Sequence, residues 1–113
     1  MDAEFADFTL LRLVKYMAIG DVTKSLASIA AGQYIDIQPA STAEWVIHNI
    51  YHEYDITIEV YDGSNSLIFD TDVGAGVYAK YAFHCTNSQR IRVKNTHVSA
   101  AKLIGFDGII THI

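Results

Sequence analysis

Cysteine and proline are scarce in this sequence, with Cys85 and Pro39 as the only examples among 113 residues. A single cysteine excludes an intramolecular disulfide, so the fold depends on its apolar core. Because Cys85 lies within an alternation of apolar residues, we expect a buried structural thiol and not a nucleophile. Pro39 ends a predicted strand, since proline cannot donate a hydrogen bond to a neighbouring strand.

Basic residues are also few, with eight Lys and Arg against thirteen Asp and Glu, for a net charge of −5. Proteins that bind nucleic acid usually carry a basic excess that neutralises phosphates, so we expect no nucleic-acid partner. Only 19% of residues are charged and 50% are hydrophobic, which excludes a disordered chain. A single small domain with this much apolar surface is expected to bury part of it against other subunits.

Long apolar runs are missing as well. The apolar stretch 10–19 contains Arg12 and Lys15 and is too short to span a bilayer. The first residues are acidic at Asp2, Glu4 and Asp7, which does not fit a signal peptide. We therefore expect synthesis in the cytosol and no membrane partner.

No motif for catalysis or metal binding is found. The sequence has neither Gly-x-Ser-x-Gly nor a glycine-rich phosphate loop, and none of its five histidines forms His-x-His. On one strand, His48 and His52 would share a face but lie about 13 Å apart. Asp70, Asp72 and Gly74 form only half a calcium loop, and we expect an ordinary turn there. The sequence predicts no catalytic, cofactor-binding or metal-binding residue, and no enzyme.

What the sequence does contain is a two-residue rhythm of apolar and polar positions, which predicts half-buried antiparallel strands. Turn residues separate these strands, with 62–65 as the clearest hairpin signal and Asp107-Gly108 as a further turn. About seven to nine strands at this spacing predict an all-β sandwich or small barrel. The predicted strands lie near 27–30, 33–38, 45–51, 56–61, 66–70, 77–85, 89–95, 100–105 and 109–112.

The N-terminal segment 1–20 differs from the domain predicted for 21–113. Its acidic start and later basic residues suit a helix dipole, but its apolar residues form no clean helical stripe. We therefore predict a helix or an extended arm. An arm with apolar residues on several sides is more easily buried between subunits, so we place Phe8, Leu11 and Leu13 at a protein interface.

Arg90, Arg92 and Lys94 should share one face of one strand. Like charges at this spacing repel unless acidic groups lie opposite. Either Glu59 and its neighbours pair with them, or they meet an acidic patch on a partner protein. We include all three in the predicted protein interface.

The chain resembles small virion proteins of tailed bacteriophages, among them head decoration (cement) proteins, over about residues 30–112. The resemblance implies an antiparallel β-sandwich of jelly-roll type, a homotrimer bound to the major capsid protein, and a place on the outer capsid surface. It implies no catalytic residue and no cofactor. It is one of pattern, carried by Gln33-Tyr34-Ile35-Asp36-Ile37-Gln38-Pro39, Trp45-Val46-Ile47-His48-Asn49-Ile50-Tyr51, Asp62-Gly63-Ser64-Asn65, Phe83-His84-Cys85-Thr86-Asn87-Ser88 and Ile91-Arg92-Val93-Lys94-Asn95.

Three alternatives stay open. The chain could be a tail, adaptor or fibre-associated β-domain of a phage, or a small enzyme whose carboxylates meet only in the fold. It could also be a carbohydrate-binding module, in which exposed tyrosines form a stacking platform. The tyrosines considered for that platform are Tyr51, Tyr54, Tyr61 and Tyr78.

Overall fold

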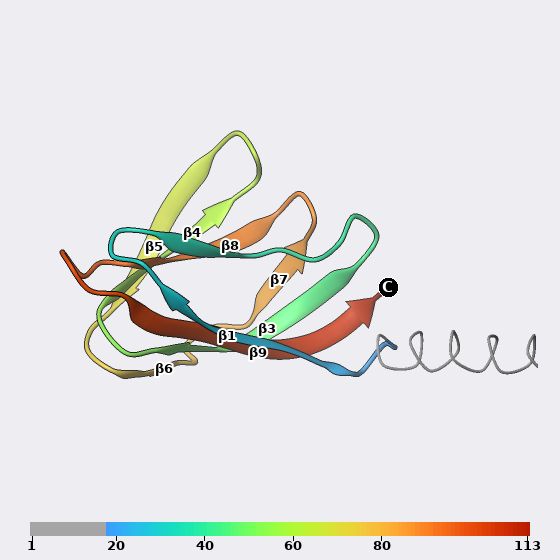
Figure 1. Ribbon diagram of the computed structural model, residues 1–113. Helices are drawn as coiled ribbons and strands as arrows, with labels where there is room; N and C mark the ends of the chain where they lie inside the picture. The colour runs from blue at the N-terminus through green and yellow to red at the C-terminus, as the bar shows by residue number, and fades with distance from the viewer. Residues whose placement is uncertain (1–17) are drawn as a thin grey trace, which may run out of the picture.

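The computed structural model describes residues 18–113, which form two packed layers of antiparallel strands (Figure 1). The predicted all-β sandwich is therefore confirmed. One sheet has the order β1-β9-β3-β6, with β7 also paired to β3, and the other has the order β2-β8-β4-β5. The strands are β1 (Val22–Ile29), β2 (Tyr34–Ile37), β3 (Glu44–His52), β4 (Ile56–Tyr61), β5 (Ser66–Asp72), β6 (Gly76–Tyr78), β7 (Phe83–Thr86), β8 (Arg90–Asn95) and β9 (Lys102–His112).

The connections between strands give the sandwich a jelly-roll arrangement. Apart from the β4–β5 hairpin and the step from β6 to β7, each strand is followed by one in the opposite sheet. β6 and β7 pair with successive parts of β3, so together they occupy the place of one strand. The two sheets consequently enclose a single core.

Isoleucine dominates this core. Ile47 and Ile50 of β3 face Ile58 of β4 and Val93 of β8, and all four are fully buried. Full burial of a side chain of this size contributes roughly 1.5–3 kcal/mol. These β-branched residues fit the pleated surface of a strand, which explains why the apolar rhythm predicted the strands well.

The hairpin predicted at 62–65 is confirmed. The backbone N–H of Asp62 donates to the carbonyl of Asn65, and Gly63 has a φ of 97°. The Asp62 carboxylate accepts hydrogen bonds from the N–H groups of Ser64 and Asn65, which lowers its pKa. This side chain therefore fixes the turn that joins β4 to β5.

The single strand predicted for 77–85 is wrong in one respect. It is divided into β6 and β7, with 79–82 outside both. Tyr78 is buried in β6, whereas Phe83 and Cys85 face the core from β7. The side chains that point into the core are therefore at an even-numbered position in β6 and at odd-numbered positions in β7. The break at 79–82 provides the one-residue shift that this change requires.

The turn predicted at Asp107-Gly108 is also wrong, because β9 runs through it as one strand of 11 residues. The glycines of β9 serve close approach between strands. A Cβ on Gly105 would lie 2.3 Å from the carbonyl oxygen of Ser25, and one on Gly108 would lie 2.3 Å from that of Val46. Glycine at these positions lets β1 and β3 pack on either side of β9.

β1 is longer than the strand expected near 27–30 and forms an edge of its sheet. Six of its eight residues are exposed, so the strand shows little of the apolar alternation that marks a half-buried strand in the sequence. The predictions for residues 1–17, including the helix or arm and the interface residues Phe8, Leu11 and Leu13, lie outside the described residues. Within 18–113, no helix is long and apolar enough to cross a membrane.

Candidate functional site

The outer face of the four-stranded sheet carries the three cations predicted from the sequence. Arg90, Arg92 and Lys94 alternate along β8 with the buried Ile91 and Val93, so all three project away from the core. β8 lies between β2 and β4, and its outward side chains therefore have neighbours on both sides.

The acidic partner of the arginines is Asp36 of β2. Arg92 Nε donates to Asp36 Oδ1 at 2.7 Å, and Arg90 Nε lies 3.5 Å from Asp36 Oδ2. The hydrogen bond from Arg92 raises the pKa of that guanidinium above its usual value. Glu59 lies opposite Arg92 in register, yet Asp36 is the only carboxylate within 4 Å of either arginine among the described residues. The pairing with an acidic neighbour thus involves β2 rather than the predicted Glu59.

Two tyrosines stack on the same guanidinium groups. The Arg92 guanidinium carbon lies 3.9 Å from the ring centroid of Tyr61 and 4.4 Å from that of Tyr34. Arg90 lies 4.5 Å from the Tyr61 ring. Cation–π contacts of this kind hold flexible arginines in fixed positions. We call the set Tyr34, Asp36, Tyr61, Arg90, Arg92 and Lys94 the Arg–Tyr face.

The Arg–Tyr face carries more positive than negative charge. Arg90 Nε is buried without a hydrogen-bond partner in the described part of the chain, and Lys94 is exposed. The three cations outnumber the two nearby acids, Asp36 and Glu59, in a chain whose net charge is −5. The face is thus a local positive region on an acidic protein, and a partner with carboxylate groups would fit it.

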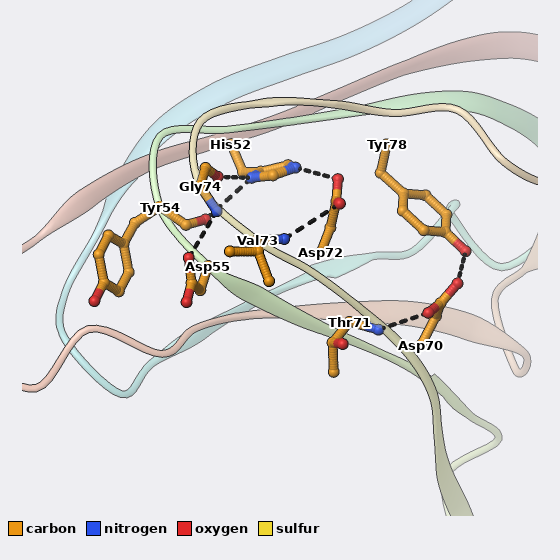
Figure 2. Close-up of polar contacts among 9 residues, drawn as sticks. All are labelled: His52, Tyr54, Asp55, Asp70, Thr71, Asp72, Val73, Gly74 and Tyr78. Atoms are coloured by element: carbon orange, nitrogen blue, oxygen red, sulfur yellow. Dashed lines mark hydrogen bonds and ion pairs between the residues drawn. The ribbon is translucent and has the colours of Figure 1, made fainter.

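A second polar cluster lies between the two sheets (Figure 2). His52 of β3 is buried, and its Nδ1 lies 2.7 Å from the carbonyl oxygen of Gly74 and 3.0 Å from that of Tyr54. Its Nε2 lies 2.8 Å from Asp72 Oδ2. Each ring nitrogen therefore faces an acceptor. The N–H of Gly74 also donates to Asp55 at 2.7 Å, which fixes the loop after β5.

Asp70, two residues before Asp72 on β5, also forms a hydrogen bond to the opposite sheet. The hydroxyl of Tyr78 in β6 donates to Asp70 Oδ2 at 2.7 Å, and Figure 2 shows this contact beside the one between His52 and Asp72. Burial and this hydrogen bond raise the pKa of Tyr78, whereas the same bond lowers the pKa of Asp70. We call His52, Asp70, Asp72 and Tyr78 the inter-sheet clamp, because it joins β5 of one sheet to β3 and β6 of the other.

The clamp accounts for the acidic residues that looked like half a calcium loop. The carboxylates of Asp70 and Asp72 are engaged by Tyr78 and His52. No group of three or more His, Cys, Asp or Glu side chains within 18–113 is arranged to hold a metal ion. These contacts hold β5 and the loop that follows it against the opposite sheet.

The histidine geometry expected from the sequence is wrong. A β-bulge between Ile47 and Asn49 shifts the alternation of β3, so His48 is exposed whereas His52 points into the interior. The bulge is an irregularity that a two-residue rhythm cannot predict.

A third cluster lies on the outer face of the five-stranded sheet. Asn49 Nδ2 donates to Asp107 Oδ1 at 2.8 Å, and the hydroxyl of Tyr51 donates to the other carboxylate oxygen. The bond to Asp107 raises the pKa of Tyr51. Cross-strand pairs of this kind stabilise the sheet surface.

The four tyrosines considered for a carbohydrate platform do not share a surface. Tyr51 lies on the outer face of the five-stranded sheet, Tyr61 belongs to the Arg–Tyr face, and Tyr78 is buried. Tyr54 is exposed beside His97 and Lys102. They therefore form no common stacking surface for a sugar.

Cys85 is buried, as predicted, and burial raises the pKa of its thiol to about 11. Such a thiol is a poor nucleophile at neutral pH, because it is almost entirely protonated. Cys85 therefore belongs to the core.

Two of these features could not be found from the sequence. The alternation of Tyr34 and Asp36 with apolar residues placed them on one strand face, but the pairing of β2 with β8 was needed to bring them to the arginines. The clamp joins residues that are 20 and 8 positions apart across two sheets. No protein-family model matches the chain, and no curated protein shows significant similarity to it.

Proposed function

We propose that the chain is a non-enzymatic structural protein of a phage virion that binds the outer capsid surface as a homotrimer and stabilises the head. The major capsid protein is the proposed partner. Two considerations support this: the resemblance of residues 30–112 to head decoration proteins, and a jelly-roll sandwich whose outer face displays fixed arginines and tyrosines.

The Arg–Tyr face is the observation on which this proposal mainly depends. Arg and Tyr are enriched at the energetic centres of protein interfaces. Here Arg92 is already held between Tyr34 and Tyr61, so little side-chain entropy is lost when a partner binds. An acidic patch on a capsid subunit would complement the three cations.

Binding to an assembled lattice would stabilise the head by mass action, since the protein would favour the lattice over dissociated subunits. A trimer would strengthen a modest contact further through avidity. A small protein without an active site is sufficient for this role.

Co-sedimentation with purified phage heads tests the proposal. We expect the protein to sediment with heads and the double variant R90A/R92A to lose at least about tenfold in affinity, because truncation of a hot-spot Arg at an interface centre costs about 2 kcal/mol or more. Lys24→Ala is the matched control, since this exposed lysine lies on β1 of the other sheet.

Binding to tails in place of heads would favour a tail or adaptor role. Binding to neither, with specific retention on glycans, would contradict the proposal. A major capsid gene beside the gene for this chain would support the head assignment.

A further inference from the structure

One edge of the sandwich leaves apolar inner surface uncovered. In the β4–β5 hairpin, Leu67 pairs with Val60, and both project to the inner face of their sheet. Val60 packs against the core, whereas Leu67 is 62% exposed. The hairpin tip thus extends past the strands of the opposite sheet that would cover it.

Aromatic residues line a cavity of about 300 Å³ at this same edge. Phe69 of β5 and Phe83 of β7 are in contact, with ring centroids 5.3 Å apart, and Tyr81 beside them is 51% exposed. Val60 and Ile91 also line it, together with Ala82, His84 and Gln89. We call Val60, Leu67, Phe69, Tyr81, Phe83 and Ile91 the open edge. Its volume and mainly apolar and aromatic lining suit one or two apolar side chains.

The N-terminal segment joins the domain at the opposite edge. β5 ends the order of one sheet, and β6 with β7 ends the order of the other, whereas β1 and β2 lie at the far ends. Residue 18 leads into β1 through a turn at Gly20, whose N–H donates to Ile110. Residue 18, where the described chain begins, thus lies on the side away from the open edge.

The composition of this segment fits an apolar cavity. It contains two phenylalanines, three leucines, a valine and two methionines within 17 residues: Met1, Phe5, Phe8, Leu10, Leu11, Leu13, Val14 and Met17. At the maximum rise of about 3.3–3.6 Å per residue, a chain of this length could reach about 55–60 Å. That is enough to reach a neighbouring small domain.

We propose that the open edge of one copy binds the apolar N-terminal segment of a second copy, and that these contacts run head to tail. Each copy would donate its segment from the β1 edge and accept another at the β5–β7 edge. Two different surfaces then meet at every contact, and such heterologous contacts close into a ring when the rotation allows. This inference rests on the proposed homotrimeric assembly and names the surfaces that form it.

Two charge-introducing variants test the two halves of the contact separately. Leu67→Glu damages the open edge and leaves the segment intact, whereas Leu13→Glu does the reverse. We expect each variant alone to need at least about tenfold higher concentration to assemble, measured by light scattering and sedimentation velocity. Val98→Glu, at a loop residue that is 94% exposed, is the control and should assemble like the native chain.

Mixing the two variants gives a sharper readout. Only one productive contact can form, between the intact segment of Leu67→Glu and the intact open edge of Leu13→Glu. We therefore expect a one-to-one dimer that does not grow into a ring. A native ring that survives Leu67→Glu unchanged, or a mixture that shows no dimer, would overturn the inference.

A cysteine pair keeps the test valid if a charged variant misfolds. The double variant L13C/L67C should form disulfide-linked oligomers, because the proposed contact brings the segment of one copy to the open edge of another. The native Cys85 is buried and should not compete for these disulfides. Crosslinking only within single chains would overturn the inference in favour of self-docking. Rings that fail to bind heads would count against the proposed function alone. Leu67→Glu chains that assemble like the native chain, while the native chain binds heads, would count against this inference alone.

Discussion

His52 Nε2 lies 2.8 Å from Asp72 Oδ2, and this contact joins β3 of one sheet to β5 of the other. The imidazole is 1% exposed and its second nitrogen faces two backbone carbonyls. A buried polar ring can be tolerated only because each nitrogen has a partner. The clamp therefore sets how the loop after β5 returns to the five-stranded sheet.

Removing the Asp72 carboxylate should destabilise the fold. Asp72→Ala leaves His52 Nε2 buried without an acceptor, and we expect a loss on the order of 1–3 kcal/mol in the free energy of unfolding. Urea denaturation monitored by tryptophan fluorescence measures it. Thr71→Ala, at the exposed neighbouring position of β5, should cost much less. An equal loss in both variants would contradict the role of the clamp.

The Asp70–Tyr78 bond should make stability depend on acid pH. Hydrogen bonds from the Tyr78 hydroxyl and the Thr71 N–H hold the pKa of Asp70 below the value of about 3.9 expected in the unfolded chain. Since the folded pKa is the lower one, this stabilisation is present above about pH 4 and is lost as the pH falls through the folded value.

Asp70→Asn should therefore reduce the loss of stability between about pH 4 and pH 2 relative to the native chain. Urea titrations at a series of pH values provide the measurement. Tyr78→Phe should have the same direction of effect, because it removes the strongest contribution to the lowered pKa. Unchanged slopes in both variants would contradict the assignment.

The glycines of β9 should be sensitive to any added side chain. Gly105→Ala places a Cβ 2.3 Å from the Ser25 carbonyl oxygen, so β1 must shift, and overpacking of this kind typically costs about 1–3 kcal/mol. Gly76→Ala is the matched control, because a Cβ there meets nothing within 4 Å and the backbone has an ordinary φ. Thermal denaturation should give a lower melting temperature for Gly105→Ala than for Gly76→Ala. Similar melting temperatures would contradict the close approach of β1 to Gly105.

Cys85 should react slowly in the folded protein. With a thiol pKa of about 11, only about one molecule in a thousand carries a thiolate at pH 8, and burial limits access further. Labelling with a thiol reagent should accelerate strongly in concentrated urea. Equal rates in the native and unfolded chains would show that the thiol is accessible.

The strand positions could be predicted largely from the sequence, because the core is built from isoleucine and valine at alternate positions. The strand at 56–61 and the hairpin at 62–65 match the structure. The errors occur where the rhythm changes phase or is broken by glycine. At 79–82 the alternation of inward and outward side chains shifts by one residue. In β9, glycines that look like a turn signal in the sequence instead make room for the neighbouring strands.

The candidate site was only partly predictable. The shared face of Arg90, Arg92 and Lys94 follows from alternation alone, but the identity of their acidic neighbour depends on which strands pair. Asp36 and Arg92 are 56 residues apart, and nothing local to either residue indicates their contact. The same holds for the inter-sheet clamp, since two layers must pack before His52 meets Asp72.

Co-sedimentation of the native chain with purified phage heads, compared with R90A/R92A and Lys24→Ala, tests whether the Arg–Tyr face binds the capsid. We expect saturable binding to heads by the native chain and by Lys24→Ala, and at least about tenfold weaker binding by R90A/R92A. Heads that bind neither the native chain nor its variants would contradict the proposal. So would equal binding by R90A/R92A and the native chain, because the Arg–Tyr face would then have no part in the contact.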